Sequence, residues 1–328
     1  MKKILITGGA GYLGHILTQK LISKGYFVII IDPLIFGQQL YIKLFNHPNV
    51  EFIVGLAGDS YVLKNILKNV YAVIHLSGLS NDPTCELDEL LTKKVNVDAS
   101  IILLKMSKDA GVKRFIYASS CSVYGFTGDK VVTELSPVNP LTAYARSKVI
   151  NEELINKEQS DDFTVSCLRK STLFGASQRM RFDLVINTMT GSAMSNGNIT
   201  INGGAQWRPF LHVCDAADAY IHILEADKDI INGQIYNVGD NGNNYKIIDI
   251  AKMVINIIPN TILIQKDSPD QRSYHVNFDK INKINWNTKI SINEGIIEIK
   301  KMFDSGIVKN YRDINYFNIK RMITYLNI

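Results

Sequence analysis

The chain has 328 residues, of which 46% are hydrophobic, and its 36 basic and 31 acidic side chains leave a formal charge of +5. A chain of this length can bury a large core and is expected to form about two structural lobes. Charged residues are interspersed and no apolar run approaches the length of a bilayer span, which excludes a nucleic-acid-binding protein and a membrane protein from the expected classes. The four cysteines, Cys85, Cys121, Cys167 and Cys214, are widely spaced, which favours a reducing cytoplasm over a disulfide framework.

The first half of the chain alternates short apolar runs with helical patterns. Strands are predicted at Lys3 to Thr7, Phe27 to Ile31, Val50 to Val54, Ala72 to Leu76, Arg114 to Ala118 and Thr164 to Leu168. Helices are predicted at Tyr12 to Lys24, Tyr61 to Lys68, Glu86 to Ala110 and Tyr144 to Glu158. Continuously apolar strands separated by helices predict an α/β fold of the Rossmann type, a doubly wound parallel sheet with ligands at the carboxyl ends of its strands.

The pattern changes after Arg169. An amphipathic stretch, Leu184 to Met194, lies among Gly, Asn and Ser residues, and a further strand is predicted at Gln234 to Val238. The expected division is a Rossmann domain formed by 1–172, to which 211–240 return, and a smaller C-terminal substrate-binding lobe formed by 173–210 and 241–328. The sequence assigns no role to the aromatic, Lys- and Asn-rich tail from Asn310.

A glycine-rich turn follows the first predicted strand and opens the first predicted helix. Glycine is needed where the strand turns sharply, where backbone approaches a phosphate and where the helix packs on the strand. The free N–H groups at the start of that helix then point toward a pyrophosphate. This context predicts a dinucleotide site formed by Gly8, Gly11, Tyr12, Leu13 and Gly14.

Two aspartates follow later strands of the predicted sheet. Asp32 ends the second strand, where a carboxylate accepts hydrogen bonds from ribose hydroxyls and repels a ribose phosphate, which favours NAD over NADP. The alternative is a solvated turn aspartate before Pro33. Asp59 lies where it would meet the adenine amino group, although Gly58-Asp59 is also an ordinary turn.

Tyr144 and Lys148 are four residues apart, so they share one face of a helix. A phenol with a pKa of about 10 is a poor base at neutral pH, but a neighbouring ammonium stabilises the phenolate. Tyr144 would take an alcohol proton while hydride leaves the same carbon. Ser120, at the end of an apolar strand, would hold the alcohol oxygen. The alternative is an exposed tyrosine and lysine on a surface helix.

These motifs occur together with others in one order. The further segments are Ser119 to Gly125 (SSCSVYG), Leu168-Arg169, Phe174-Gly175, Arg208 to Val213 (RPFLHV) and Tyr236 to Gly239 (YNVG). With the glycine turn, Tyr144 and Lys148, they span residues 3 to about 290. The chain therefore resembles the extended short-chain dehydrogenase/reductase family, in the branch that acts on sugar nucleotides.

The resemblance implies roles for particular residues. Tyr144 would be the acid/base, Lys148 would also bind the nicotinamide ribose, and Ser120 would position the substrate oxygen. The cofactor would be NAD, with Leu76, Ser77, Gly78 and Asn96 near it. The substrate would be a nucleoside-diphosphate sugar, contacted by Ser80, Ser120, Thr172, Arg181, Asn187, Arg208 and Arg272.

Several of these assignments have alternatives. Arg272 is as well explained by a surface ion pair, and Arg181 faces either nucleotide or solvent. Many family members carry asparagine where this chain has Thr172. His212 lies between apolar residues and is interpreted as structural, and no side-chain cluster has metal-ligand spacing, so no metal is expected. The helices Asp88 to Ala110 and Tyr144 to Glu158 would form a homodimer through a four-helix bundle.

The residues after Ser120 bear on the reaction. Family 4,6-dehydratases have an Asp-Glu pair where this chain has Cys121 and Ser122, which disfavours dehydration. Cys121 is interpreted as a small buried residue. The favoured reaction is 4-epimerisation of the sugar, and the alternative is a C4 dehydrogenase or reductase of a hexose or heptose. A non-catalytic NAD-binding regulator and a scaffold subunit are weaker alternatives.

Overall fold

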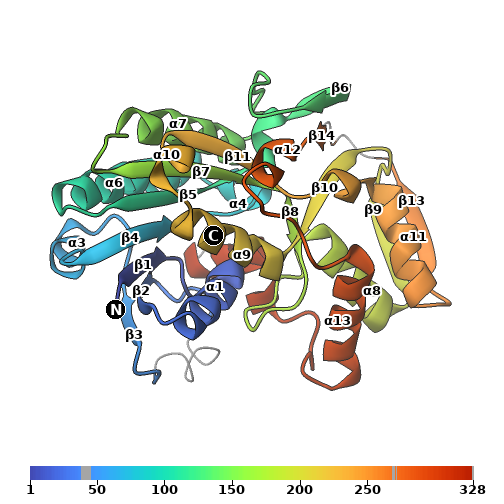
Figure 1. Ribbon diagram of the computed structural model, residues 1–328. Coiled ribbons are helices and arrows are strands. Elements are labelled where there is room, and N and C mark those ends of the chain that lie inside the picture. Colours follow the sequence, from blue (N-terminus) through green and yellow to red (C-terminus); the bar gives the residue numbers. More distant parts are fainter. Residues whose placement is uncertain (38–45, 268–269, 271, 327–328) are drawn as a thin grey trace.

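A parallel sheet of seven strands forms the centre of the molecule (Figure 1). The computed structural model describes residues 1–37, 46–267, 270 and 272–326. The sheet has the order β11-β7-β5-β4-β1-β2-β3. Its strands are β1 (Lys3–Thr7), β2 (Phe27–Asp32), β3 (Val50–Val54), β4 (Val70–His75), β5 (Arg114–Ser120), β7 (Thr164–Lys170) and β11 (Gln234–Val238). The prediction of a doubly wound, Rossmann-type sheet is confirmed.

Helices cover both faces of this sheet because alternate side chains of its strands point to opposite sides. Ile4 and Ile6 of β1 are fully buried in one cluster with Leu17, whereas Leu5 is fully buried in another cluster with Leu103. The first face is covered by α1 (Tyr12–Ser23) and α9 (Val213–Glu225). The second face is covered by α3 (Ser60–Ile66), α6 (Ala99–Asp109) and α7 (Ala143–Lys157).

The long helix predicted from Glu86 to Ala110 is divided in the structure. It consists of α5 (Glu89–Thr92), a π-helical segment (Lys93–Asp98) and α6, and it is preceded by the separate α4 (Asp82–Cys85). The Asp88 carboxylate accepts a hydrogen bond from the Leu91 N–H and so starts a new helix at that point. Periodicity alone does not reveal such a wide turn, which often marks a functional site.

A smaller lobe lies to the right in Figure 1. One sheet joins β8 (Thr172–Phe174), β10 (Trp207–His212) and β12 (Asn244–Lys246), and a second joins β9 (Asn198–Asn202) and β13 (Ile262–Lys266). Its helices are α8 (Val185–Asn196), α11 (Ile247–Ile257) and α13 (Ile292–Asp304). Phe174, Ile186, Ile199 and Ile250 belong to its buried core.

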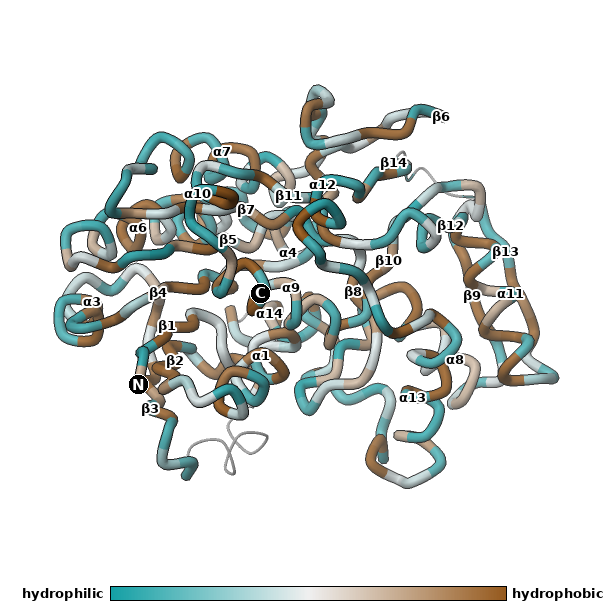
Figure 2. The backbone as a smooth tube through the Cα atoms, in the orientation of Figure 1, coloured by the Kyte–Doolittle hydropathy of each residue, from teal (hydrophilic) through white to brown (hydrophobic). Residues whose placement is uncertain are grey.

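Other elements were not predicted. β6 (Phe126–Val132) pairs with β14 (Ser273–Val276), and the short helices α10 (Lys228–Ile231) and α12 (Asp279–Asn282) flank β11 and β14. The tail forms α14 (Asn318–Leu326), which packs against α4 and lies in the middle of the molecule rather than in the smaller lobe (Figure 2). Within the described ranges, none of the helices combines the length and the apolar character that crossing a membrane requires.

Candidate active site

A cavity of about 1370 Å³ lies at the carboxyl ends of the sheet strands. It is lined by the glycine turn after β1, by Asp32 of β2, by Ser77 after β4 and by Ser120 of β5. Residues of the smaller lobe, Arg208 among them, line its other side. Pockets for a single small ligand are usually ~300–1,000 Å³, so this cavity has room for two ligands side by side.

The glycine turn has no space for side chains. A Cβ atom on Gly8, which has a φ of +74°, would lie 2.9 Å from the backbone of Ser77. A Cβ atom on Gly14 would lie 2.3 Å from the Gly8 carbonyl oxygen. Gly11 is the N-cap of α1, and it has no side chain to cap the first N–H groups of the helix. Gly11 lines the cavity together with Tyr12 and Leu13, the first two residues of α1. This close approach of bare backbone and a helix N-terminus fits a pyrophosphate.

Both predicted cofactor aspartates line the cavity. Asp32 is buried, and its carboxylate accepts hydrogen bonds from the Ala10 N–H at 3.1 Å and the Leu34 N–H at 2.9 Å. Burial raises the pKa of Asp32, while these two N–H groups act in the opposite direction. Asp59 caps α3, so the turn interpretation of its carboxylate also holds.

Leu76, Ser77 and Gly78 line the cavity as predicted, but Asn96 does not. The Asn96 side chain accepts a hydrogen bond from the Leu79 N–H at 2.7 Å and donates one to the Leu79 carbonyl at 3.0 Å. A Cβ atom on Gly78 would lie 2.9 Å from Asn96 Oδ1. The π-helical segment thus places Asn96 behind the loop, and its predicted contact with the cofactor is corrected to support of the loop that lines the cavity.

The three predicted catalytic residues meet at one wall of the cavity. Tyr144 is in the first turn of α7, which Thr142 caps by accepting a hydrogen bond from the Ala145 N–H. The Lys148 ammonium donates to the Ala118 carbonyl at 2.8 Å and lies 5.3 Å from the centre of the Tyr144 ring. Ser120 is at the end of β5 and hydrogen-bonds Tyr144.

The pKa values at this wall do not favour the phenolate that the sequence predicts for Tyr144. Burial raises the pKa of Tyr144 above its usual value of 10, the Asp82 carboxylate raises it further, and the hydrogen bond with Ser120 lowers it. Burial also lowers the pKa of Lys148 to about 8. The ammonium at position 148 therefore does not by itself ionise the phenol, and Tyr144 carries its proton at neutral pH.

A buried ion pair supports the catalytic wall from behind. Arg169 of β7 donates to the Glu152 carboxylate of α7 through Nε at 2.9 Å and Nη2 at 2.7 Å. The Ser119 hydroxyl of β5 donates to the same carboxylate at 2.5 Å. Glu152 thereby joins the strand that ends in Ser120 to the helix that carries Tyr144.

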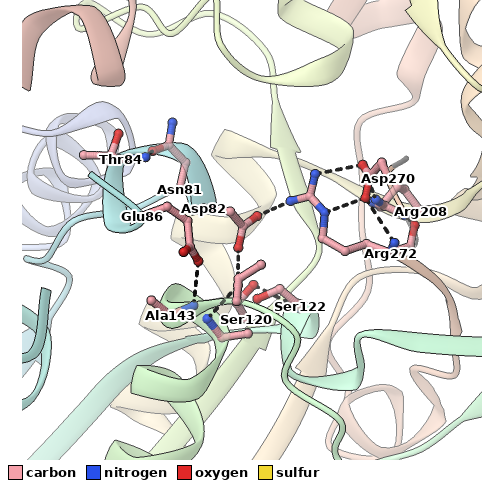
Figure 3. Close-up of polar contacts among 12 residues, drawn as sticks. Asn81, Asp82, Thr84, Glu86, Ser120, Ser122, Ala143, Arg208, Asp270 and Arg272 are labelled. Carbon is pink, nitrogen blue, oxygen red and sulfur yellow. Dashed lines mark hydrogen bonds and ion pairs between the residues drawn. The ribbon is translucent and has the colours of Figure 1, made fainter. Parts of the chain in front are cut away.

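The predicted phosphate-binding arginines are paired with carboxylates (Figure 3). Arg272 forms ion pairs with Asp270 and with Asp82, and Arg208 donates to Asp270 at 3.3 Å and to the Arg272 carbonyl. On the other side of Asp82, its carboxylate accepts a hydrogen bond from Thr142 at 2.5 Å. Both arginines line the cavity, but a pyrophosphate bound beside them would join a network that already holds negative charge.

The remaining predicted substrate residues divide into two groups. Ser80, Thr172 and Arg181 line the cavity, and Arg181 forms a two-pronged ion pair with Asp183 at 2.9 and 3.0 Å. Asn187 is fully buried and does not line it. Its amide accepts from the Gly175 N–H and donates to the Arg181 carbonyl, so its predicted substrate contact is corrected to a brace inside the smaller lobe.

The model of the NAD dependent epimerase/dehydratase family matches residues 4–239. This chain belongs to that family. Relatives include the dTDP-D-glucose 4,6-dehydratase of Homo sapiens, 28% identical over 90% of this chain and 88% of the relative. The UDP-glucose 4-epimerase of Lactobacillus helveticus is 28% identical, and the match covers 79% of this chain and 84% of that relative. Among solved structures, MoeE5 in complex with UDP-glucose and NAD has a TM-score of 0.79 and 25% identity, covering 93% of this chain and 99% of that chain.

Membership in the epimerase/dehydratase family establishes NAD as the cofactor and nucleotide sugars as the substrate class of the family. The glycine turn and the buried Asp32 fit NAD, because both offer what a pyrophosphate and a ribose diol require. Relatives of both kinds, epimerases and dehydratases, match this chain with equal identity. Sequence identity to these relatives therefore does not distinguish the two reactions.

Cys121 and Ser122 replace the acidic pair of the family's dehydratases. The Cys121 thiol donates to the Arg169 carbonyl at 3.1 Å, away from the cavity, and burial raises the pKa of Cys121. Ser122 lines the cavity, and its buried hydroxyl has no hydrogen-bond partner within the described part of the chain. Sequence reasoning did not assign Ser122, although its place two residues after Ser120 was the available signal.

His212 lies outside the cavity lining, at the start of α9. Its Nε2 is 2.8 Å from the Glu298 carboxylate, and its Nδ1 accepts the Cys214 N–H. Because Nδ1 accepts a hydrogen bond, the ring carries its proton on Nε2, which donates to the Glu298 carboxylate. This hydrogen bond ties β10 to α13, which agrees with the structural role expected for His212.

Proposed function

We propose that this protein is a sugar-nucleotide 4-epimerase, which inverts the configuration at C4 of a sugar carried on a nucleoside diphosphate. The observation that carries the proposal is the cavity wall itself. Ser120, Tyr144 and Lys148 lie together there, and the two positions after Ser120 hold no acid. The names of the relatives support the substrate class.

The chain's own residues would move the proton. The chemistry that NAD supplies when bound is reversible hydride transfer at the sugar carbon. The Ser120 hydroxyl would hold the C4 oxygen within reach of Tyr144. With the positive charges of the oxidised nicotinamide and of Lys148 beside it, Tyr144 would lose its own proton first. The phenolate would then take the C4 hydroxyl proton in the oxidation half and return it to the other epimer in the reduction half. Lys148, held against the Ala118 carbonyl, would orient the phenol and supply positive charge beside it.

Dehydration is less well supported by the cavity's carboxylates. Elimination of water needs a protonated acid at the leaving oxygen. The ion pair with Arg181 holds the pKa of Asp183 below its usual range, and the Arg272 guanidinium does the same for Asp270. These two carboxyl groups are therefore poor proton donors at neutral pH.

A substrate panel tests the proposal. The protein is incubated with UDP-, GDP- and dTDP-sugars and NAD, and the products are weighed and separated. An isomer of unchanged mass is the expected result. Loss of two hydrogens would instead identify a C4 dehydrogenase, and loss of water would overturn the interpretation of Cys121 and Ser122.

We further propose a homodimer in the cytoplasm. α6 and α7 would pair with their copies as a four-helix bundle, and Ile150 of α7 is 44% exposed, as expected of a residue in such a contact. The four cysteines are free thiols, which suits a reducing compartment. Sedimentation at the mass of one chain would refute the dimer.

A further inference from the structure

The tail helix α14 forms a wall of the cavity that no family motif accounts for. Its lining residues are Asn318, Ile319, Met322, Tyr325 and Leu326. Their spacing puts them on one face of the helix, while Lys320, Ile323 and Thr324 are exposed on the other. We propose that α14 is a retaining part of the cofactor site: it closes over the glycine turn and keeps NAD bound between turnovers.

The contacts of α14 place it across the glycine turn. Arg321 Nε donates to the carbonyl of Ile35, three residues after β2, at 2.5 Å. Asn318 Nδ2 donates to the Ser80 hydroxyl, on the loop after β4, at 2.9 Å. In the sheet, β1 lies between β4 and β2, and the glycine turn follows β1. A helix anchored to the loops on both sides therefore spans the place where the pyrophosphate binds.

The side chains on the inner face of α14 pack directly against the rest of the protein. Met322 is 4% exposed and belongs to an apolar cluster with Leu79, Cys85 and Ala143, against which Tyr144 packs. Asn318 is also buried and accepts a hydrogen bond from Arg179 Nη2 at 2.5 Å. Its backbone N–H donates to the Asp183 carboxylate at 3.3 Å. The helix thus bridges the loop after β2, the loop after β4 and the start of the smaller lobe.

α14 lines the same cavity as Gly11 and Asp32. In this proposal a dinucleotide held by those two residues would lie against α14, and release of the dinucleotide would require the helix to move. α14 is joined to the rest of the chain by side-chain contacts and not by a sheet, which allows such movement.

Retention suits the proposed function, on which this consequence rests. A 4-epimerase ends each turnover with its cofactor in the starting state and gains nothing by releasing it. A dehydrogenase must exchange the cofactor at every turnover. A closed wall over the dinucleotide therefore favours the first reaction over the second.

The experiment compares cofactor release. Each protein is loaded with NADH and chased with excess NAD, and the loss of bound NADH fluorescence gives the dissociation rate. The variants are a chain ending at Phe317 and the full chain with Met322→Ser. We expect both to release NADH at least tenfold faster than the parent. Ile323→Ser, on the outer face where Ile323 is 37% exposed, is the matched control and should release it at the parent's rate.

The outcomes separate this proposal from the function. Equal release rates in the parent, the shortened chain and Met322→Ser would overturn the retaining role, even if the parent epimerises a sugar. Tighter binding in the shortened chain would also overturn it, since α14 would then obstruct the site. Faster release in both variants supports the role even if no sugar in the panel is epimerised, and only the proposed function would then fail.

Discussion

Replacing Tyr144 with phenylalanine is expected to lower kcat by about a thousandfold, a typical effect of removing a general acid–base group. The change deletes the one hydroxyl at this wall that can give a proton to the C4 oxygen and take it back. Ser120 is an alcohol of much higher pKa, and the Lys148 ammonium is bound to the Ala118 carbonyl. The measurement is kcat and KM on the substrate that the panel identifies.

The phenylalanine variant should differ from the parent in little else. It keeps the ring that packs against the Leu79 cluster, so the melting temperature and the NADH release rate should be close to the parent's. Tyr236→Phe is the matched control, because that buried hydroxyl donates to the Ile230 carbonyl outside the cavity, and its kcat should be unchanged. If Tyr144→Phe kept more than a tenth of the activity, the proton would have to travel through another group.

Local patterns made much of the fold and of the cofactor site predictable. A strand, a glycine turn and a helix follow one another within about twenty residues, so the neighbouring sequence is enough to identify Gly8, Gly11 and Gly14 as a dinucleotide turn. Tyr144 and Lys148 are one helical turn apart, and their proximity needs no tertiary information. The predicted strands were apolar enough to be buried on both faces, and all seven are present.

Contacts between distant segments were not predictable in the same way. The pairing of Arg272 with Asp82 joins residues 190 positions apart, so the sequence offered an ion pair for Arg272 as an alternative but did not identify its partner. The contact of Asn318 with Ser80 spans 238 positions. The sequence showed only that the tail is aromatic and rich in Lys and Asn, because what its helix covers depends on a fold that brings both ends of the chain together.

Asn96 and Asn187 were assigned to ligands by the resemblance to the family. In the structure each satisfies backbone groups of a loop that itself lines the cavity, Leu79 for one and Gly175 for the other. Buried amides of this kind act on the site through the backbone, and a single sequence does not distinguish them from ligand contacts.

Glu152→Gln is expected to lower the free energy of unfolding by roughly 3–5 kcal/mol, because it leaves a buried arginine without its counter-charge. The side chains of Arg169 and Glu152 are 5% and 4% exposed, so water cannot replace the missing charge. In the amide, an NH2 group replaces one of the two carboxylate oxygens, so the side chain can no longer accept from both Nε and Nη2 of Arg169. Chemical denaturation of the parent and the variant measures the difference.

The adjacent residue on α7 supplies the control. Glu153 is exposed, so Glu153→Gln should change the unfolding free energy by less than about 0.5 kcal/mol. The double variant Glu152→Leu with Arg169→Met removes both charges and should recover much of the loss, since apolar replacement of a buried pair is often neutral. If the double variant recovered stability but had a lower kcat than the parent, the ion pair would be needed to position Ser120 against Tyr144. Recovery of both quantities would instead limit the pair to a role in stability.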